Sequence, residues 1–208
     1  MNGQRRVWFE AIAPEAGTGQ DAVQGWEVGV PGTVPIDAVV LRYTSAIRTK
    51  KLHLDQGLKA GRIKDDDCYV ISLNAASVPH AGFGSRPSYG SRSLYGIGDL
   101  TLLLDTTTDR IVDHFHAARE SVRKENGAAV SVRPFLSEEY SACSAALIST
   151  VAFWNLTSDI GSDFEVYHNP LALNAVAPEM LSSFDQFSWA YGADGGVLSR
   201  TPSARKVI

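Results

Sequence analysis

The chain has 208 residues, of which 44% are hydrophobic, and a formal net charge of −4. This length and apolar content suit one sizeable core, so we expect a single α/β domain over residues 1–190 and a flexible C-terminal tail over residues 191–208. The acidic balance excludes a protein that coats nucleic acid or an anionic membrane with its whole surface.

The two cysteines, Cys68 and Cys143, lie far apart among apolar residues and lack the spacing of a metal or redox motif. We expect both to be buried reduced thiols, which is typical of a cytoplasmic protein. No run of about 18 apolar residues occurs, and the polar residues 1–6 lead into a strand rather than a signal-peptide apolar region. We therefore expect neither export nor a membrane span.

The segment VWFEAIA, residues 7–13, predicts a strand that ends at Pro14. Both of its faces are apolar, so we expect a central strand that is covered on both sides. Glu10 is its only charged residue. A carboxylate in that setting must be paired, hydrogen-bonded, metal-bound or shifted in pKa. The alternatives for Glu10 are therefore a structural pair with an arginine and a catalytic or metal-binding role.

A helix is predicted from a cap at Thr44 or Ser45 to Gly61. Its apolar stripe consists of Ala46, Ile47, Leu54 and Leu58. Lys50 and Lys51 fill the gap in this stripe. An ammonium group that faces a core needs an anionic partner, so these lysines predict an anionic site beneath the helix. The alternative is that their stems lie along the apolar surface while the charged ends reach water.

Basic residues gather along and just after this helix. Seven of them lie between residues 42 and 64, against the single acid Asp55, a local excess of +6: Arg42, Arg48, Lys50, Lys51, Lys59, Arg62 and Lys64. A polyanion docks where such an excess lies. We therefore expect a nucleic-acid partner at the basic helix 44–60, with a solvated helix face as the alternative.

The flanking segments place this helix in a larger unit. Residues 15–35 are rich in glycine and proline and predict a long loop, and the apolar run 36–41 leads into the helix. Residues 68–74 predict a buried strand. Strand, helix and strand in this order indicate a crossover unit, in which adjacent strands can be parallel.

Residues 79–99 predict a loop dense in glycine, serine, arginine and tyrosine. Its Arg86 and Arg92 are of a type that contacts phosphates, and its Tyr89 and Tyr95 are of a type that stacks on bases. A flexible loop without such a role is the favoured reading of this composition.

The second half of the chain gives weaker signals. Residues 100–104 predict a strand, whereas residues 109–126 fit either a helix or the second strand of a hairpin. His114 and His116 are separated by one residue, so on a strand both would point to the same face, as two ligands of one metal ion do. No third ligand lies nearby in the sequence. Residues 129–132 predict an edge strand.

Ser137, followed by two acids, predicts the start of a second helix whose apolar face runs to Trp154. Residues 164–167 predict a short strand that leads to His168 in a turn, where a histidine is usually structural. Residues 178–187 predict a short terminal helix.

The order of an acidic strand, a basic helix and a buried strand resembles the later part of the PD-(D/E)XK restriction-endonuclease-like core. More closely, the chain resembles an uncharacterised bacterial family associated with that superfamily, over roughly residues 7–170. The strings that carry this resemblance are WFEAIAP (8–14), LRYTSAI (41–47) with Lys50, YVISLN (69–74) and VYHNP (166–170). The resemblance implies a central mixed β-sheet flanked by helices and Mg²⁺-dependent hydrolysis of DNA phosphodiester bonds.

In such a centre, Mg²⁺ held by carboxylates activates water and offsets charge on the phosphorus oxygens. The resemblance implies that Glu10 is a catalytic metal ligand, and Lys50 or Lys51 on the neighbouring helix is expected to supply the catalytic cation. The residues that it implies for substrate binding are Arg42, Arg48 and Thr44.

Two departures from the superfamily pattern lower the expected activity. Ile12 stands where the superfamily has a lysine two positions after the acid, and no acid precedes Glu10. Either an N-terminal part has been lost or the metal site is incomplete, so we expect weak or no nuclease activity. The alternative is a non-catalytic accessory module with the same fold that binds nucleic acid or protein. A hydrolase with His114 or His168 as its base ranks last, because the chain has no G-x-S-x-G or HExxH motif.

Overall fold

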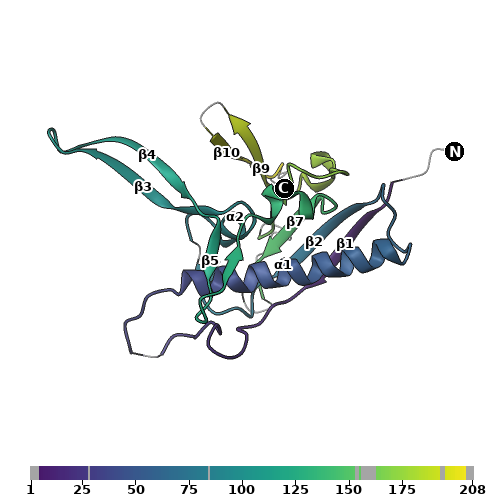
Figure 1. Cartoon of the computed structure of the whole chain (residues 1–208), viewed down its shortest axis with the longest axis horizontal. Helices are drawn as coiled ribbons and strands as arrows, with labels where there is room; N and C mark the ends of the chain where they lie inside the picture. The colour runs from purple at the N-terminus through teal and green to yellow at the C-terminus, as the bar shows by residue number, and fades with distance from the viewer. Residues whose placement is uncertain are drawn as a thin grey trace.

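The structure, a computed structural model, describes residues 5–27, 29–83, 85–152, 155, 163–192 and 195–204. Its centre is a six-stranded sheet with the order β1-β2-β7-β8-β9-β10 (Figure 1). These strands are β1 (Val7–Ile12), β2 (Cys68–Asn74), β7 (Ala145–Ser149), β8 (Glu165–His168), β9 (Asp185–Gly192) and β10 (Gly195–Thr201). The pairs β1/β2, β2/β7 and β8/β9 are parallel, and β7/β8 and β9/β10 are antiparallel. The predicted α/β class with a mixed sheet is therefore confirmed.

Two antiparallel hairpins lie outside this sheet. They are formed by β3 (Ile97–Asp105) with β4 (Arg110–Ala118), and by β5 (Ser121–Arg123) with β6 (Ala129–Ser131). The ambiguous segment 109–126 is thus strand rather than helix. The short 3-10 helices are η1 (Ala81–Phe83), η2 (Pro134–Leu136), η3 (Glu138–Tyr140) and η4 (Pro178–Leu181).

The long helix α1 (Ile36–Lys59) begins well before the predicted cap at Thr44. The apolar run 36–41 forms its first turns, with the core-facing side chains buried. Thr44 lies inside the helix, where its hydroxyl donates to the carbonyl oxygen of Val40 at 2.9 Å instead of capping the helix. The predicted end is confirmed, because Gly61 has a φ of +67° in the left-handed region that ends helices.

Alternate residues of the sheet pack into two separate cores. On one face, α1 and α2 (Tyr89–Leu94) cover a large core to which β2 contributes Tyr69, Ile71 and Leu73. On the other face, Cys68 and Val70 pack in a smaller core with Val176 and Leu181. Figure 1 shows α1 running across the sheet. Both cysteines are buried free thiols, as predicted.

β1 lies at the edge of the sheet, so the prediction of a central strand is wrong. In the described part of the chain β1 pairs only with β2. Its Trp8 and Ile12 pack against the core, whereas Phe9 on the opposite face is 52% exposed. An apolar composition on both faces therefore did not mean that both faces are covered. The crossover itself is confirmed, since β1 and β2 are parallel and α1 connects them.

The predicted helix from Ser137 to Trp154 is also wrong. Only the turn η3 follows Ser137, and residues 145–149 form β7 in the middle of the sheet. All five residues of β7 are buried, so the strand has no face in water. The sequence of such a short buried strand does not alternate between apolar and polar residues, and it therefore cannot be told from a buried helix by its periodicity. Trp154 lies outside the described residues.

The segment 79–99 is more ordered than a flexible loop. It contains η1 and α2, and Tyr89, Arg92 and Tyr95 are buried. The Arg92 guanidinium donates to Asp99 at 2.6 Å. These three side chains hold the segment against the core, so they are not available for a nucleic acid.

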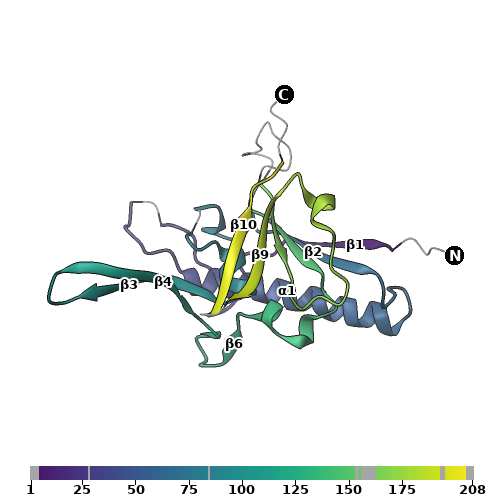
Figure 2. The same cartoon turned by 90° about the horizontal axis from the view of Figure 1, so that it is seen from above.

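The C-terminal segment joins the sheet. In place of the predicted helix 178–187, η4 is followed by β9, and β10 lies within the range 191–208 where we expected a flexible tail. Figure 2 shows β9 and β10 side by side. Phe187 of β9 stacks on Tyr167 of β8, with ring centroids 4.9 Å apart. No helix in the described part of the chain is both long and apolar enough to cross a membrane.

Candidate functional site

The sequence-predicted pairing of Glu10 with the helix is present in part. Trp8, Glu10 and Ile12 lie on the face of β1 that looks toward α1. Glu10 accepts a hydrogen bond from the Lys50 ammonium at 2.9 Å on its Oε1 atom. The side chains of Lys50 and Glu10 are 12% and 30% exposed, so the pair is partly shielded from water.

Two further side chains, which the sequence reasoning missed, complete what we call the Glu10 cluster: Glu10, Lys50, His53 and Tyr69. His53 Nδ1 lies 2.7 Å from Glu10 Oε1, and the Tyr69 hydroxyl donates to Glu10 Oε2. That hydroxyl also lies 3.2 Å from the backbone oxygen of Lys50. His53 follows Lys50 by one helical turn, a spacing visible in the sequence. Tyr69 arrives through the strand register, which pairs it with Trp8.

The cluster stabilises the charged form of Glu10. Burial by itself raises the pKa of this carboxyl, but hydrogen bonds from Tyr69, Lys50 and His53 outweigh burial and lower the pKa to about 2. Burial and the Glu10 carboxylate together raise the pKa of the Tyr69 hydroxyl well above its usual range. Glu10 is therefore a carboxylate, and Tyr69 a neutral hydrogen-bond donor, at any pH near neutrality.

The residues of the cluster do not fit a Mg²⁺ ion. Mg²⁺ requires several oxygen ligands in octahedral geometry, commonly including carboxylates. Both oxygens of Glu10 already accept hydrogen bonds, one of them from an ammonium group whose charge repels a cation. Within the described residues, no group of three or more His, Cys, Asp or Glu side chains is arranged to hold a metal ion.

The other predicted site residues do not join Glu10. Lys51 pairs with Asp55 on the same helix, with Nζ and Oδ2 2.7 Å apart. Arg42 donates from Nε to the backbone oxygen of Glu15 at 2.9 Å. Thr44 is buried, so it is not available to a substrate. Arg48 is exposed on α1.

A shallow groove lies beside the Glu10 cluster, between β1 and the second half of α1. Trp8 and Phe9 line it from the strand, His53 and Gln56 line it from the helix, and Arg62 lines it from the turn after the helix. At Gly57 the helix lies close to the turn that follows it. A Cβ on Gly57 would lie 2.5 Å from the Ile63 side chain, so this position has no room for a larger residue unless Ile63 moves.

The position of Trp8 in this groove is fixed by the buried Asp67. Asp67 Oδ2 accepts hydrogen bonds from Arg6 Nη2 at 2.6 Å and from the Trp8 indole nitrogen at 2.9 Å. The hydrogen bonds from Arg6, from the backbone of Lys64 and from Trp8 hold the pKa of this carboxyl well below its usual range. The Arg6 guanidinium carbon lies 5.2 Å from the centre of the Trp8 ring.

Exposed cations lie along α1 and in the turn that follows it, and one of them, Arg62, lines this groove. Arg48, Lys59, Arg62 and Lys64 are exposed, and none of them forms an ion pair with another described residue. We call Lys59, Arg62 and Lys64 the cationic end of α1. Their charge remains available to an external anion, unlike the charges of Lys50 and Lys51.

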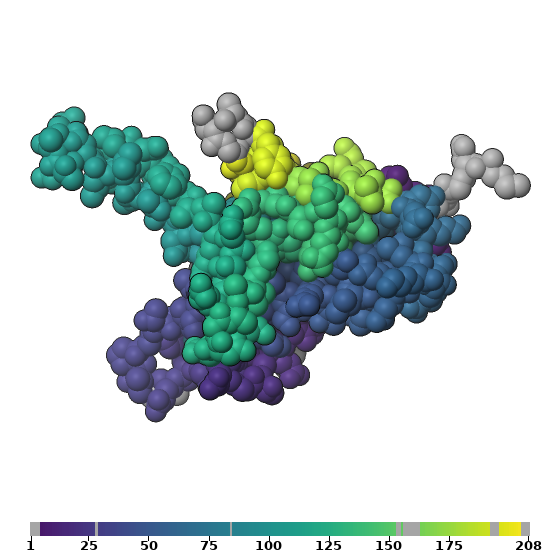
Figure 3. Space-filling model, viewed as in Figure 1, coloured from purple at the N-terminus to yellow at the C-terminus, as the bar shows by residue number. Residues whose placement is uncertain are grey.

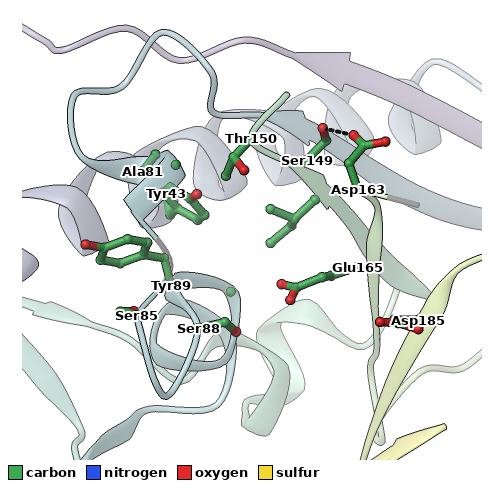
Figure 4. A pocket seen from close by; sticks show the side chains of 13 residues that line it. Tyr43, Ala81, Ser85, Ser88, Tyr89, Ser149, Thr150, Asp163, Glu165 and Asp185 are labelled. Carbon is green, nitrogen blue, oxygen red and sulfur yellow. Dashed lines mark hydrogen bonds between the residues drawn. The ribbon is translucent and has the colours of Figure 1, made fainter. Parts of the chain in front are cut away.

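A second cavity, of about 220 Å³, lies between α2 and the ends of β7, β8 and β9 (Figure 4). We call it the acidic pocket, because Asp163, Glu165 and Asp185 line it. The Glu165 carboxylate points into the cavity, and Asp163 accepts a hydrogen bond from the Ser149 hydroxyl. Nothing in the sequence had indicated this pocket, because it joins residues from three separate strands.

The surroundings of Glu165 shift its pKa in the direction opposite to that of Glu10. Burial raises the pKa of its carboxyl, and the nearby Asp185 adds to that effect. The hydrogen bond that the Tyr167 hydroxyl donates to Oε2 at 2.5 Å offsets only part of it. Three acids in one small cavity disfavour phosphate, so the acidic pocket is unsuited to a nucleic-acid backbone.

The histidines singled out in the sequence lie away from the Glu10 cluster. His114 and His116 are on β4, where His116 Nδ1 lies 3.1 Å from the backbone oxygen of Gly98. His168 Nε2 lies 2.7 Å from the side-chain oxygen of Gln186. That contact joins β8 to β9 and gives His168 a structural partner.

Comparison with protein-family models, with curated proteins and with solved structures gave no significant match.

Proposed function

We propose that this chain is a nuclease-like domain that binds nucleic acid through the end of α1 and does not by itself cleave it with Mg²⁺. The observation that carries the proposal is the contrast between two sets of lysines and arginines. Lys50 and Lys51 are paired with acids, whereas Lys59, Arg62 and Lys64 are exposed and free of ion pairs within the described part of the chain.

The absence of cleavage follows from the state of Glu10. A general base or a metal ligand needs a free lone pair directed at the substrate or the ion. The Glu10 oxygens are directed instead at Lys50, His53 and Tyr69. The cluster therefore acts as a polar link between β1, α1 and β2.

The groove next to the cationic end suits a single strand of nucleic acid. Such strands bind where cations follow the backbone and aromatic rings stack on bases. Phe9 is 52% exposed on β1, and Trp8 is held in place by Asp67. Asp65 and Asp66 follow Lys64, so the electrostatic attraction is local and moderate rather than that of a wholly basic surface.

We also propose that β1, α1 and β2 correspond to the later part of a restriction-endonuclease-like core. An acid on a strand, followed by a crossover helix with a lysine and by a parallel strand, supports this proposal. Fold analogy does not carry activity, so the function rests on the charges and the groove.

A combined binding and cleavage assay tests the function. Fluorescence anisotropy with a labelled single-stranded oligonucleotide should show binding that is weakened in the Lys59→Ala/Arg62→Ala double variant. Lys124→Ala, which removes an exposed lysine from the turn between β5 and β6, should bind as the wild type does. The same samples in millimolar Mg²⁺ should leave the oligonucleotide intact. Mg²⁺-dependent cleavage that is lost in Glu10→Ala would show the proposal to be wrong, and so would equal binding by the double variant.

A further inference from the structure

The acidic pocket and the cationic end of α1 lie at opposite ends of the parallel strands. The pocket forms where β2 and β7 end, since Ser149, the last residue of β7, lines it and pairs with Asn74, the last residue of β2. The cationic end of α1 instead precedes the start of β2. Figure 3 shows the blue residues that end α1 on the right and the teal hairpin of β3 and β4, which follows α2, on the left. In open α/β sheets, ligands commonly bind outside the carboxyl ends of the strands.

The size and the wall of this cavity suit a small polar molecule. A cavity of about 150 Å³ already holds benzene, so the volume of about 220 Å³ leaves room for roughly six to ten non-hydrogen atoms. Besides the three acids, the wall includes the hydroxyl-bearing residues Ser85, Ser88, Ser149 and Thr150. Polar groups that converge on a cavity fix the orientation of a ligand by hydrogen bonds.

Tyr43 reaches this cavity from α1 with a hydroxyl that has no partner. The residue is only 1% exposed, and its ring lies 5.8 Å from that of Tyr89, centroid to centroid. Figure 4 shows the hydroxyl end of Tyr43 facing the cavity. In the part of the chain that the structure describes, no group forms a hydrogen bond with this hydroxyl. A buried hydroxyl without a partner is costly, so it points to an occupant of the cavity that supplies one.

Two carboxylates of the pocket each keep one oxygen without a partner. The Tyr167 hydroxyl donates to Oε2 of Glu165, and the Ser149 hydroxyl donates to Oδ2 of Asp163. Among the described residues, nothing donates to Oε1 of Glu165 or Oδ1 of Asp163, and neither acid forms an ion pair. The Glu165 carboxylate is directed into the cavity (Figure 4). A partly buried carboxylate of this kind calls for a cationic hydrogen-bond donor.

The charge of the cavity selects the chemistry of its occupant. Anions are repelled, and a neutral alcohol supplies no counter-charge. A metal ion fits poorly, because no three His, Cys, Asp or Glu side chains of the described chain are arranged to hold one. A primary ammonium group carries a positive charge and three N–H donors. Its charge partners are Glu165 and Asp163, since Asp185 already pairs with Arg200 at 2.5 Å.

From these observations we infer that the acidic pocket binds a small aliphatic ammonium compound. Its N–H groups donate to Oε1 of Glu165 and to Asp163, and the Tyr43 hydroxyl forms a further hydrogen bond with it. The alkyl part of the ligand packs on the Tyr43 ring and on Ile148, which also lines the cavity. The pocket shares no lining residue with the groove beside the Glu10 cluster, so this is a second site.

Isothermal titration calorimetry with 1,4-diaminobutane tests this inference, with butane-1,4-diol as the uncharged compound of matching length. The wild type should bind one molecule of the diamine and should not bind the diol. Glu165→Gln should weaken binding about tenfold or more, because an ionic hydrogen bond is lost. Tyr43→Phe, which removes only the hydroxyl, should weaken it roughly threefold to tenfold. The control Glu125→Gln alters an exposed acid outside the pocket and should bind as the wild type does.

Near-UV circular dichroism checks that the variants are folded. A wild type that does not bind the diamine, or that binds the diol equally well, would overturn the inference. So would a Glu165→Gln protein with wild-type affinity, or a loss of affinity in Glu125→Gln as large as in Glu165→Gln, because binding would then reflect only the net charge. Displacement of the diamine by an equal concentration of Mg²⁺ would show an inorganic cation site instead. None of these readouts involves nucleic acid, so the inference stands or fails independently of the proposed function.

Discussion

The Lys50 ammonium nitrogen lies 2.9 Å from Oε1 of Glu10, which joins the edge strand β1 to the helix that follows it. Tyr69 on β2 and His53 on α1 bind the same carboxylate. One acid thus links the three elements of the crossover unit. This arrangement explains why an otherwise apolar strand carries a single charge.

Replacing Glu10 by glutamine should lower the stability of the protein. Glutamine keeps the shape of the side chain but leaves the Lys50 ammonium, whose side chain is 12% exposed, without a compensating charge. We expect a loss of about 1–2 kcal/mol in the free energy of unfolding, measured by urea denaturation. Glu27→Gln, at an exposed position, is the control and should change little. Equal stability of wild type and Glu10→Gln would mean that the cluster is energetically neutral.

The advantage of the wild type over Glu10→Gln should depend on pH. The pKa of Glu10 is lowered from 4.5 to about 2 in the folded chain, so the unfolded chain takes up the proton first and acid favours unfolding. The difference in unfolding free energy should be complete near pH 6 and should disappear as the pH falls from 4.5 toward 2. Urea titrations of both proteins across this range measure it. A difference that stays constant down to pH 2 would contradict the assigned hydrogen bonds.

Glu165→Gln should have the opposite effect on stability. Burial raises the pKa of Glu165, with a contribution from Asp185, so its charge is less favourable in the folded than in the unfolded chain. At a pH above the usual pKa of a glutamate, this charge therefore lowers the stability of the folded chain. Glutamine has no charge but can still accept the hydrogen bond from the Tyr167 hydroxyl. We expect the Tm of the variant at pH 8 to exceed that of the wild type by roughly a few degrees.

Below pH 4 this difference in Tm should disappear, because Glu165 is then protonated in the folded and in the unfolded chain. Glu125→Gln, at an exposed position, should show no such pattern. A Glu165→Gln protein that is less stable at pH 8 would show that the carboxylate charge is needed in the acidic pocket.

The crossover unit was predictable because its signals are local. The apolar segment with Glu10, the stripe interrupted by lysines and the glycine at position 61 each depend on neighbours in the sequence. The start of α1 was missed because Pro35 at its N-cap position makes no side-chain hydrogen bond, and no capping pattern is visible there. β9 did have a signal, since Phe187, Trp189 and Tyr191 alternate along it.

The contacts that were missed depend on the tertiary structure. Tyr69 reaches Glu10 only through the register of β1 on β2, which residue patterns do not fix. β7 is buried on both faces, so it has no alternation to distinguish it from a buried helix. The acidic pocket joins Asp163 and Glu165, at the start of β8, to Asp185, at the start of β9, and only the folded sheet brings these two segments together.

The salt dependence of oligonucleotide binding tests the central proposal most directly. If Lys59 and Arg62 contact phosphates, the logarithm of the association constant should fall linearly with the logarithm of salt concentration. The Lys59→Ala/Arg62→Ala variant should then bind more weakly and with a slope smaller by roughly 1.4, about 0.7 for each of the two lost contacts with a single strand. Wild-type affinity that does not change with salt, or an unchanged slope in the variant, would contradict a nucleic-acid site at the end of α1.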